Sequence, residues 1–157
     1  MTFLQSLRCW QAYANDSGAL TTASDSYQTV NMDTELCNEE FYSLSGDVVT
    51  INADGLYRVT LDCCIDFSNY DGGSVAKFNG AEWQVFLNDT TALSPVFTVF
   101  QFATNNAVPY SSSSGRHMYT FSASDNLRVK MKRENTTPPL TFQDEEQTMR
   151  LGLKRYW

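Results

Sequence analysis

The chain has 157 residues, which suits one domain over residues 1–157, and its hydrophobic content of 42% is enough for one packed core. Its net charge of −7 argues against nucleic acid as the main partner. No segment approaches the roughly 18 consecutive apolar residues of a membrane span, and the polar N-terminal stretch lacks a signal peptide, so we expect no membrane partner and synthesis in a cytoplasm.

Strand-like runs separated by turn residues recur along the chain, and no convincing helical period occurs. The runs cover residues 7–15, 26–32, 40–51, 57–67, 81–88, 94–104, 117–123, 126–135 and 148–157. The second half of the 40–51 run is joined to the first by Ser45, Gly46 and Asp47, which predicts a hairpin. Polar stretches at 16–26, 68–80, 105–116 and 136–147 predict loops. The sequence therefore predicts an all-β protein, an antiparallel β-sandwich of about 8–10 strands, most simply a jelly roll.

The segment LYRVTLDCCIDF, residues 56–67, alternates apolar and polar side chains without interruption after Leu56. Successive side chains of a strand point to opposite faces, so Cys63 is predicted to face the core and Cys64 to face away from it. Adjacent residues on opposite faces do not share a metal ion, and we expect all four cysteines to be thiols. The predicted core comprises Tyr57, Val59, Leu61, Ile65, Val85, Leu87, Val129, Met131, Leu151 and Leu153.

No constellation of residues indicates catalysis, and we expect neither enzymatic activity nor a cofactor. The single histidine, His117, follows a serine-rich run without a GxSxG motif, so no catalytic residue is assigned. Oxygen-bearing side chains do gather at Asp66, Asn69 and Asp71, which makes them a weak calcium candidate. Their spacing departs from the EF-hand pattern, and such residues are ordinary in loops. We therefore assign no metal site.

The order of these elements resembles the C1q/TNF-like jelly roll over nearly the whole chain. The residues that carry the resemblance are a hairpin, an ADG turn that opens a central strand, and a final strand that contains Gly152; they include Asn38, Tyr42, Gly46, Gly55, Leu56 and Tyr57. NLRVKM, from residue 126, is similar to the penultimate strand of that family. The resemblance implies a homotrimer whose subunits pack through aromatic faces.

No collagen-like stalk or signal peptide accompanies the domain, which argues against a secreted animal ligand. Bare jelly rolls of this type resemble those of bacteriophage virions, made in the host cytoplasm. The resemblance thus implies a capsid decoration (cement) or head-fibre protein that contacts the major capsid protein or other virion proteins. The alternative is a receptor- or glycan-binding head module of a phage tail or fibre.

Aromatic and apolar residues in three strand-like runs exceed what one domain of this size covers, which indicates contacts between subunits. The residues expected in the oligomer interface are Trp10, Tyr13, Phe97, Val99, Tyr156 and Trp157. Alternatively, the chain's own loops cover these residues. The charge is also uneven, since residues 1–89 hold 13 acids and 3 bases and residues 90–157 hold 5 acids and 8 bases. This skew is either chance or a complementarity between neighbouring copies.

Overall fold

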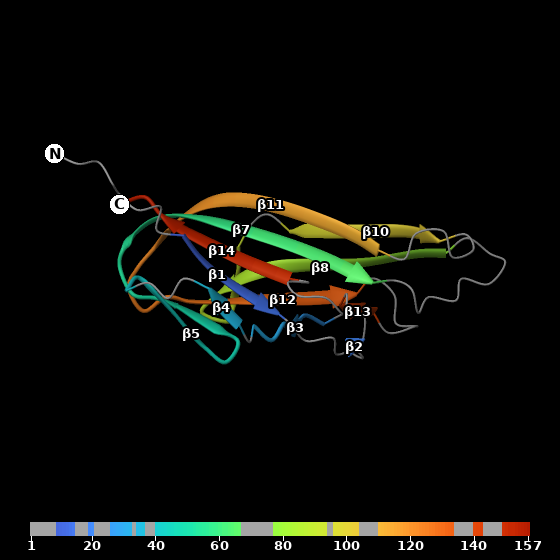
Figure 1. The fold of residues 1–157 in the computed structure, drawn as a ribbon, viewed down its shortest axis with the longest axis horizontal. Helices are drawn as coiled ribbons and strands as arrows, with labels where there is room; N and C mark the ends of the chain where they lie inside the picture. The colour runs from blue at the N-terminus through green and yellow to red at the C-terminus, as the bar shows by residue number, and fades with distance from the viewer. Residues whose placement is uncertain are drawn as a thin grey trace.

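The computed structural model describes residues 9–14, 19–20, 26–32, 34–36, 40–66, 77–93, 96–103, 110–133, 140–142 and 149–157. Within these ranges the chain forms strands and turns, arranged as two antiparallel sheets packed face to face (Figure 1). Fourteen strands are described, and nine of them have four residues or more. The predicted antiparallel β-sandwich of jelly-roll type is confirmed.

The first sheet is built on the long strand β7. Its members are β1 (Cys9–Ala14), β2 (Ala19–Leu20), β4 (Thr34–Leu36), β7 (Gly55–Asp66), β11 (Tyr110–Phe121), β13 (Leu140–Phe142) and β14 (Met149–Arg155). Strand β11 pairs with β7 on one side, while β14 and β13 share the other side. Strands β1 and β4 continue the sheet beyond β14, and β2 pairs with β13.

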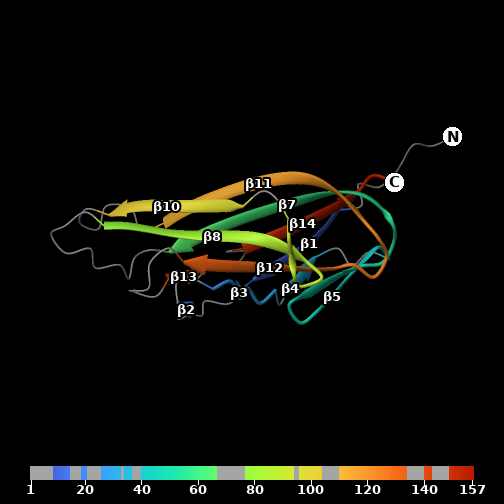
Figure 2. The ribbon, with the colours of Figure 1, turned by 180° about the vertical axis from the view of Figure 1, so that it is seen from behind.

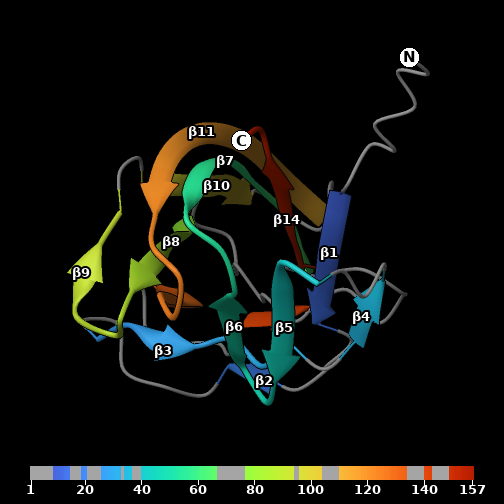
Figure 3. The same ribbon diagram turned by 90° about the vertical axis from the view of Figure 1, so that its left-hand side faces the viewer.

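The second sheet is built on β8 and β12. Its members are β3 (Gln28–Thr29), β5 (Tyr42–Ser45), β6 (Val48–Ile51), β8 (Lys77–Leu87), β9 (Thr91–Ala92), β10 (Phe97–Ala103) and β12 (Asn126–Arg133). The hydrogen-bonded order is β10–β8–β12–β6–β5, with β3 on β12 and β9 on β8. Figure 2 shows β10, β8 and β12 from their own side, and Figure 3 looks along the two layers.

The core lies between the sheets and follows the predicted alternation. Eight of the ten predicted core residues are buried: Tyr57, Val59, Leu61, Val85, Val129, Met131, Leu151 and Leu153. Leu87 is partly buried and packs against this cluster, and the side chain of Ile65 lies outside the described part. Aromatic rings fill one end, where Tyr57 contacts Tyr42 at 5.8 Å and Phe121 at 5.6 Å between ring centroids. Burial of these side chains is the main force that holds the two layers together.

Turns at one end of the sandwich lie where the sequence predicts them. Gly46 adopts φ +61° in the β5–β6 hairpin, a left-handed conformation that glycine tolerates best. The turn after β8 and the turn before β12 hold each other. The side chain of Asn88 donates to Asp125 Oδ1 at 3.1 Å and accepts from the Asn126 amide at 2.9 Å. This end of the fold is therefore fixed by hydrogen bonds as well as by packing.

Two strand boundaries and two predicted loops differ from the sequence prediction. The loops predicted at 16–26 and 136–147 contain the short strands β2 and β13. The serine-rich run was predicted as a loop up to residue 116, yet β11 begins at Tyr110 and pairs residue by residue with β7. Likewise β8 begins at Lys77, inside the predicted loop 68–80. Serine and glycine have little strand preference of their own, but a long neighbouring strand supplies backbone partners that override that preference.

Candidate functional site: the outer face of β11, β7 and β14

The outer face of the first sheet is formed by alternate residues of three neighbouring strands. On β7 the outward positions include Arg58, Thr60 and Asp62, because the residues between them are buried in the core. The antiparallel register brings residues of β11 and β14 directly beside them. We call the set of outward residues on these three strands the outer face.

Asp62 organises one part of the outer face. Ser114 of β11 donates its hydroxyl hydrogen to Asp62 Oδ1 at 2.5 Å. Arg150 of β14 donates from Nε to Asp62 Oδ2 at 2.8 Å, and its Nη2 donates to the same oxygen. Both carboxylate oxygens are therefore engaged, and the three side chains link three strands across the face.

Three cations lie on the same face beyond this cluster. Arg58 stands opposite Met118 of β11 on one side and opposite Lys154 of β14 on the other, while Arg116 stands opposite Thr60. We call Arg58, Arg116 and Lys154 the cation row. None of the three forms an ion pair with a carboxylate of the described residues. The Nε of Arg58 is buried without a hydrogen-bond partner there.

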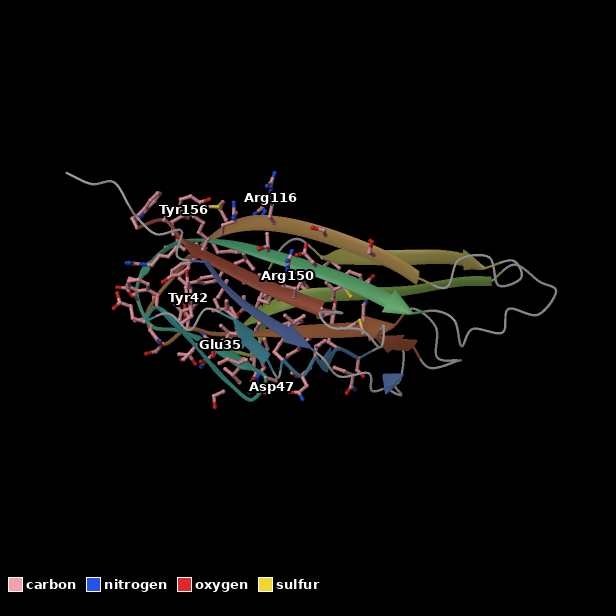
Figure 4. The ribbon with its side chains drawn as sticks, in the orientation of Figure 1. Glu35, Tyr42, Asp47, Arg116, Arg150 and Tyr156 are labelled. Carbon is pink, nitrogen blue, oxygen red and sulfur yellow. The ribbon has the colours of Figure 1, made fainter. Side chains whose placement is uncertain are left out.

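Large apolar side chains are exposed beside the cation row. The exposed fractions are 41% for Met118 and 44% for Tyr156. The ammonium of Lys154 lies 5.5 Å from the ring centre of Tyr156. Figure 4 shows Tyr156 at the end of this face and Arg116 projecting outward from β11. Tyrosine, methionine and arginine are the residue types enriched in protein interfaces.

The segment that follows β14 is fixed in place by backbone contacts. The amide of Tyr156 donates to the carbonyl of Leu56 at 2.8 Å, and Arg155 donates from Nε and Nη2 to the carbonyl of Asp54 at 3.0 and 2.6 Å. The exposure of Tyr156 is therefore set by the fold, because its backbone is tied to the start of β7.

The outer face of the second sheet has a different charge pattern. There Lys130 lies 3.4 Å from a carboxylate oxygen of Asp89, which Arg128 also contacts. Lys132 lies 2.9 Å from Glu82. The pKa of the Asp89 carboxyl group is lowered, chiefly by the hydrogen bond that it accepts from Arg128. Cations on this second face are thus balanced within the chain, whereas the cation row is not.

The predicted interface residues at the chain's end, Tyr156 and Trp157, are both exposed, and Tyr156 lies at the end of the outer face (Figure 4). In the first sheet Trp10 pairs with Leu153 and Tyr13 with Arg150 along the β1–β14 register. The side chains of Trp10 and Tyr13 lie outside the described part, so their contribution to an interface stays a prediction.

The predicted interface residues of β10 lie at the edge of the second sheet. In the β10–β8 register Phe97 pairs with Trp83 and Val99 with Ala81, and both β8 residues are fully buried. The side chains of Phe97 and Val99 are not among those described. Their role between subunits also stays a prediction.

The calcium candidate is only partly covered by the structure. Asp66 is the last residue of β7, and Asn69 and Asp71 lie outside the described residues. Elsewhere in the described ranges, no three histidine, cysteine or acidic residues come together as a metal-binding group. None of the described segments forms a helix of the length and hydropathy that a membrane span requires.

Cys63 agrees with the alternation, whereas His117 is exposed although its register partner Val59 is buried. Cys63 is buried and unbridged, as predicted for an inward position of β7. The side chains of Cys9, Cys37 and Cys64 lie outside the described part. His117 is exposed on β11 and its ring centre lies 5.0 Å from that of Tyr119.

The outer face was not predicted as a site, because its members are far apart in the chain. The alternation of Ser114, Arg116, Met118 and Thr120 was a usable signal for the outward side of β11. It was obscured by the assumption that a serine-rich run is a loop.

The two sheets, their strand order and the inward alternation define a TNF-like jelly roll. Among solved structures, the chain is similar to crystal structures of murine APRIL at pH 5.0 and at pH 8.0, with 14% and 15% sequence identity. Each match has a TM-score of 0.56 and covers 94% of this chain and 98% of the APRIL chain. No protein-family model and no curated protein sequence matches the chain. At this identity the likeness establishes the fold alone.

Proposed function

We propose that this chain is a structural protein of a bacteriophage virion, a homotrimeric capsid decoration (cement) or head-fibre protein. It acts by covering surface on the particle and carries out no chemistry. The observation that supports this proposal is the outer face, where Met118 and Tyr156 are exposed beside arginine and lysine side chains. Self-association through this face fits the trimer that the C1q/TNF-like resemblance implies.

The dimensions of the outer face are adequate for a subunit contact. Strands rise about 3.4 Å per residue and lie about 4.8 Å apart, so the twelve residues of β7 extend about 40 Å. With its neighbours β11 and β14, the face has an area of the same order as the roughly 800 Å² that one partner contributes to a standard interface. In a cyclic trimer the same contact forms three times, which multiplies its contribution to the free energy of association.

The oligomer is tested by sedimentation equilibrium of the isolated chain. A species close to three times the 17.7 kDa chain is expected. Met118→Arg, at an exposed position of the outer face, should shift the protein to lighter species. Ala92→Arg, at an exposed position of β9 in the other sheet, is the matched control and should leave the trimer intact. A monomer in the unchanged protein, at all concentrations, would contradict the trimer.

The virion assignment needs a separate experiment. Antibodies against the chain should label particles purified from cells that produce the virus carrying its gene, as seen by electron microscopy. If the chain fractionates away from the particles, the assignment to the virion is wrong. Labelling confined to tail or fibre tips, with binding of the isolated trimer to host glycans, would instead establish the alternative of a receptor-binding head.

A further inference from the structure

We infer that the cation row of Arg58, Arg116 and Lys154 binds carboxylates supplied by a second copy of the chain. The inference rests on the proposed trimer and specifies what its interface contains. It predicts that each subunit brings acidic side chains against the outer face of a neighbour, and that assembly depends on these charge contacts.

The positions of the three cations within the sheet favour the binding of a negatively charged group. Arg58 and Lys154 are direct register partners on β7 and β14. Like charges directly opposite each other destabilise an antiparallel pair, because their β-carbons lie only about 5 Å apart. Arg116 lies two residues from Met118, the partner of Arg58 on β11, which puts a third cation at the diagonal position about 7–8 Å away. One or two carboxylates above the row would contact all three.

The outer face holds no such carboxylate among its described side chains. Asp62 is the one acid there, and Ser114 and Arg150 already occupy both of its oxygens. The buried Nε of Arg58 finds no acceptor. If subunits cover this face, uncompensated cations lose water without gaining a partner, which is strongly destabilising. An interface built here therefore requires acids from outside the subunit.

A second copy is the source that the charge distribution favours. Residues 1–89 carry 13 acids against 3 bases, whereas Arg116 and Lys154 come from the basic remainder of the chain. In a cyclic trimer each contact joins two different surfaces of identical subunits. A basic face on one side and acids elsewhere on the same chain suit such a contact.

Zero-length carbodiimide cross-linking tests this contact directly, because it joins a lysine amine to a carboxylate only when the two touch. Isotope-labelled and unlabelled chains are mixed, refolded together and cross-linked, and the peptides are analysed by mass spectrometry. We expect a peptide pair that joins Lys154 of one copy to an aspartate or glutamate of another. Lys154→Arg should remove this pair while the trimer remains, since the charge is kept.

A second experiment measures the dissociation constant of the trimer for two variants and the unchanged protein over a series of salt concentrations. The triple variant Arg58→Gln, Arg116→Gln, Lys154→Gln should weaken association roughly tenfold or more. Lys130→Gln, which removes a cation from the other sheet, is the control and should change association little. Between about 0.1 M and 1 M sodium chloride, where the screening length falls from about 10 Å to about 3 Å, the difference between the triple variant and the unchanged protein should shrink.

The outcomes separate this inference from the trimer itself. A trimer without any cross-link between copies at Lys154, and with unchanged affinity in the triple variant, overturns the carboxylate contact but keeps the trimer. A trimer stabilised by sulfate or phosphate more than by chloride at equal ionic strength shows that a free oxyanion occupies the row, which also overturns it. A monomer in the unchanged protein overturns both proposals.

Discussion

Replacement of Leu61 by alanine probes the register of β7, on which both the core and the outer face depend. Leu61 is fully buried and stands between Leu151 of β14 and Gly115 of β11. Loss of three carbons removes about 2.4 kcal/mol of transfer free energy at about 0.8 kcal/mol per methylene. A cavity term adds to this, and glycine at the neighbouring position has no side chain to fill the space. We expect the free energy of unfolding to fall by about 3–4 kcal/mol, within the usual 2–5 kcal/mol range.

The assay is urea denaturation followed by circular dichroism, with Leu56→Ala as the control on the other face of the same strand. Leu56 is partly buried, so its truncation should cost less than about 1.5 kcal/mol. Both variants are measured at two protein concentrations, because the stability of an oligomer depends on concentration whereas a core defect does not. If Leu56→Ala costs as much as Leu61→Ala, the two faces of β7 are exchanged and the assigned register is wrong.

Three further predictions concern Gly55, Tyr57 and the four cysteines. Gly55→Ala should lower the free energy of unfolding by about 1–3 kcal/mol in the same assay. A β-carbon at this position would collide with the carbonyl oxygen of Trp157 and lie 2.8 Å from Arg155 Nε. An unchanged urea midpoint would mean that the segment after β14 is not held as described. Burial raises the pKa of Tyr57 above its usual 10.0, so its contribution to stability is complete below about pH 10 and is lost as the pH rises through the folded-state pKa. Tyr57→Phe should therefore make the free energy of unfolding less sensitive to alkaline pH, and an identical pH profile in both proteins would refute this. Mass spectrometry under non-reducing conditions should give the fully reduced mass for all four cysteines, and a mass lower by two hydrogens or four would reveal disulfides.

The alternation in β7 was enough to predict its buried face, because side-chain direction in a strand depends only on local geometry. The hairpin at Gly46 could also be predicted from local geometry, because glycine tolerates the positive φ of this turn best. The position of Gly152 in the final strand, which the resemblance implied, is also confirmed.

Features that depend on pairing between distant strands could not be predicted. The strand at 110–116 exists because β7 offers it backbone partners, and its serines carry no strand signal of their own. The cation row depends on the register between Arg58 and Lys154, which are separated by most of the chain. No local pattern shows that these two side chains are neighbours, or that Asp62 is already engaged by Arg150.

The position of β14 between β7 and β1 has a consequence for the order of events during folding. Strand β1 forms from residues 9–14, yet its partner in the sheet is residues 149–155. A growing chain leaves β1 without this partner until residues 149–155 have left the ribosome. Such distant pairings make folding slow, on the millisecond to second scale, because the entropy of closing the long loop is lost before the contact forms. Since Arg150 and Lys154 belong to β14, the outer face is also completed last. Subunits that associate through this face must therefore wait until β14 has joined the sheet, so assembly cannot begin before residues 149–155 are synthesised and paired.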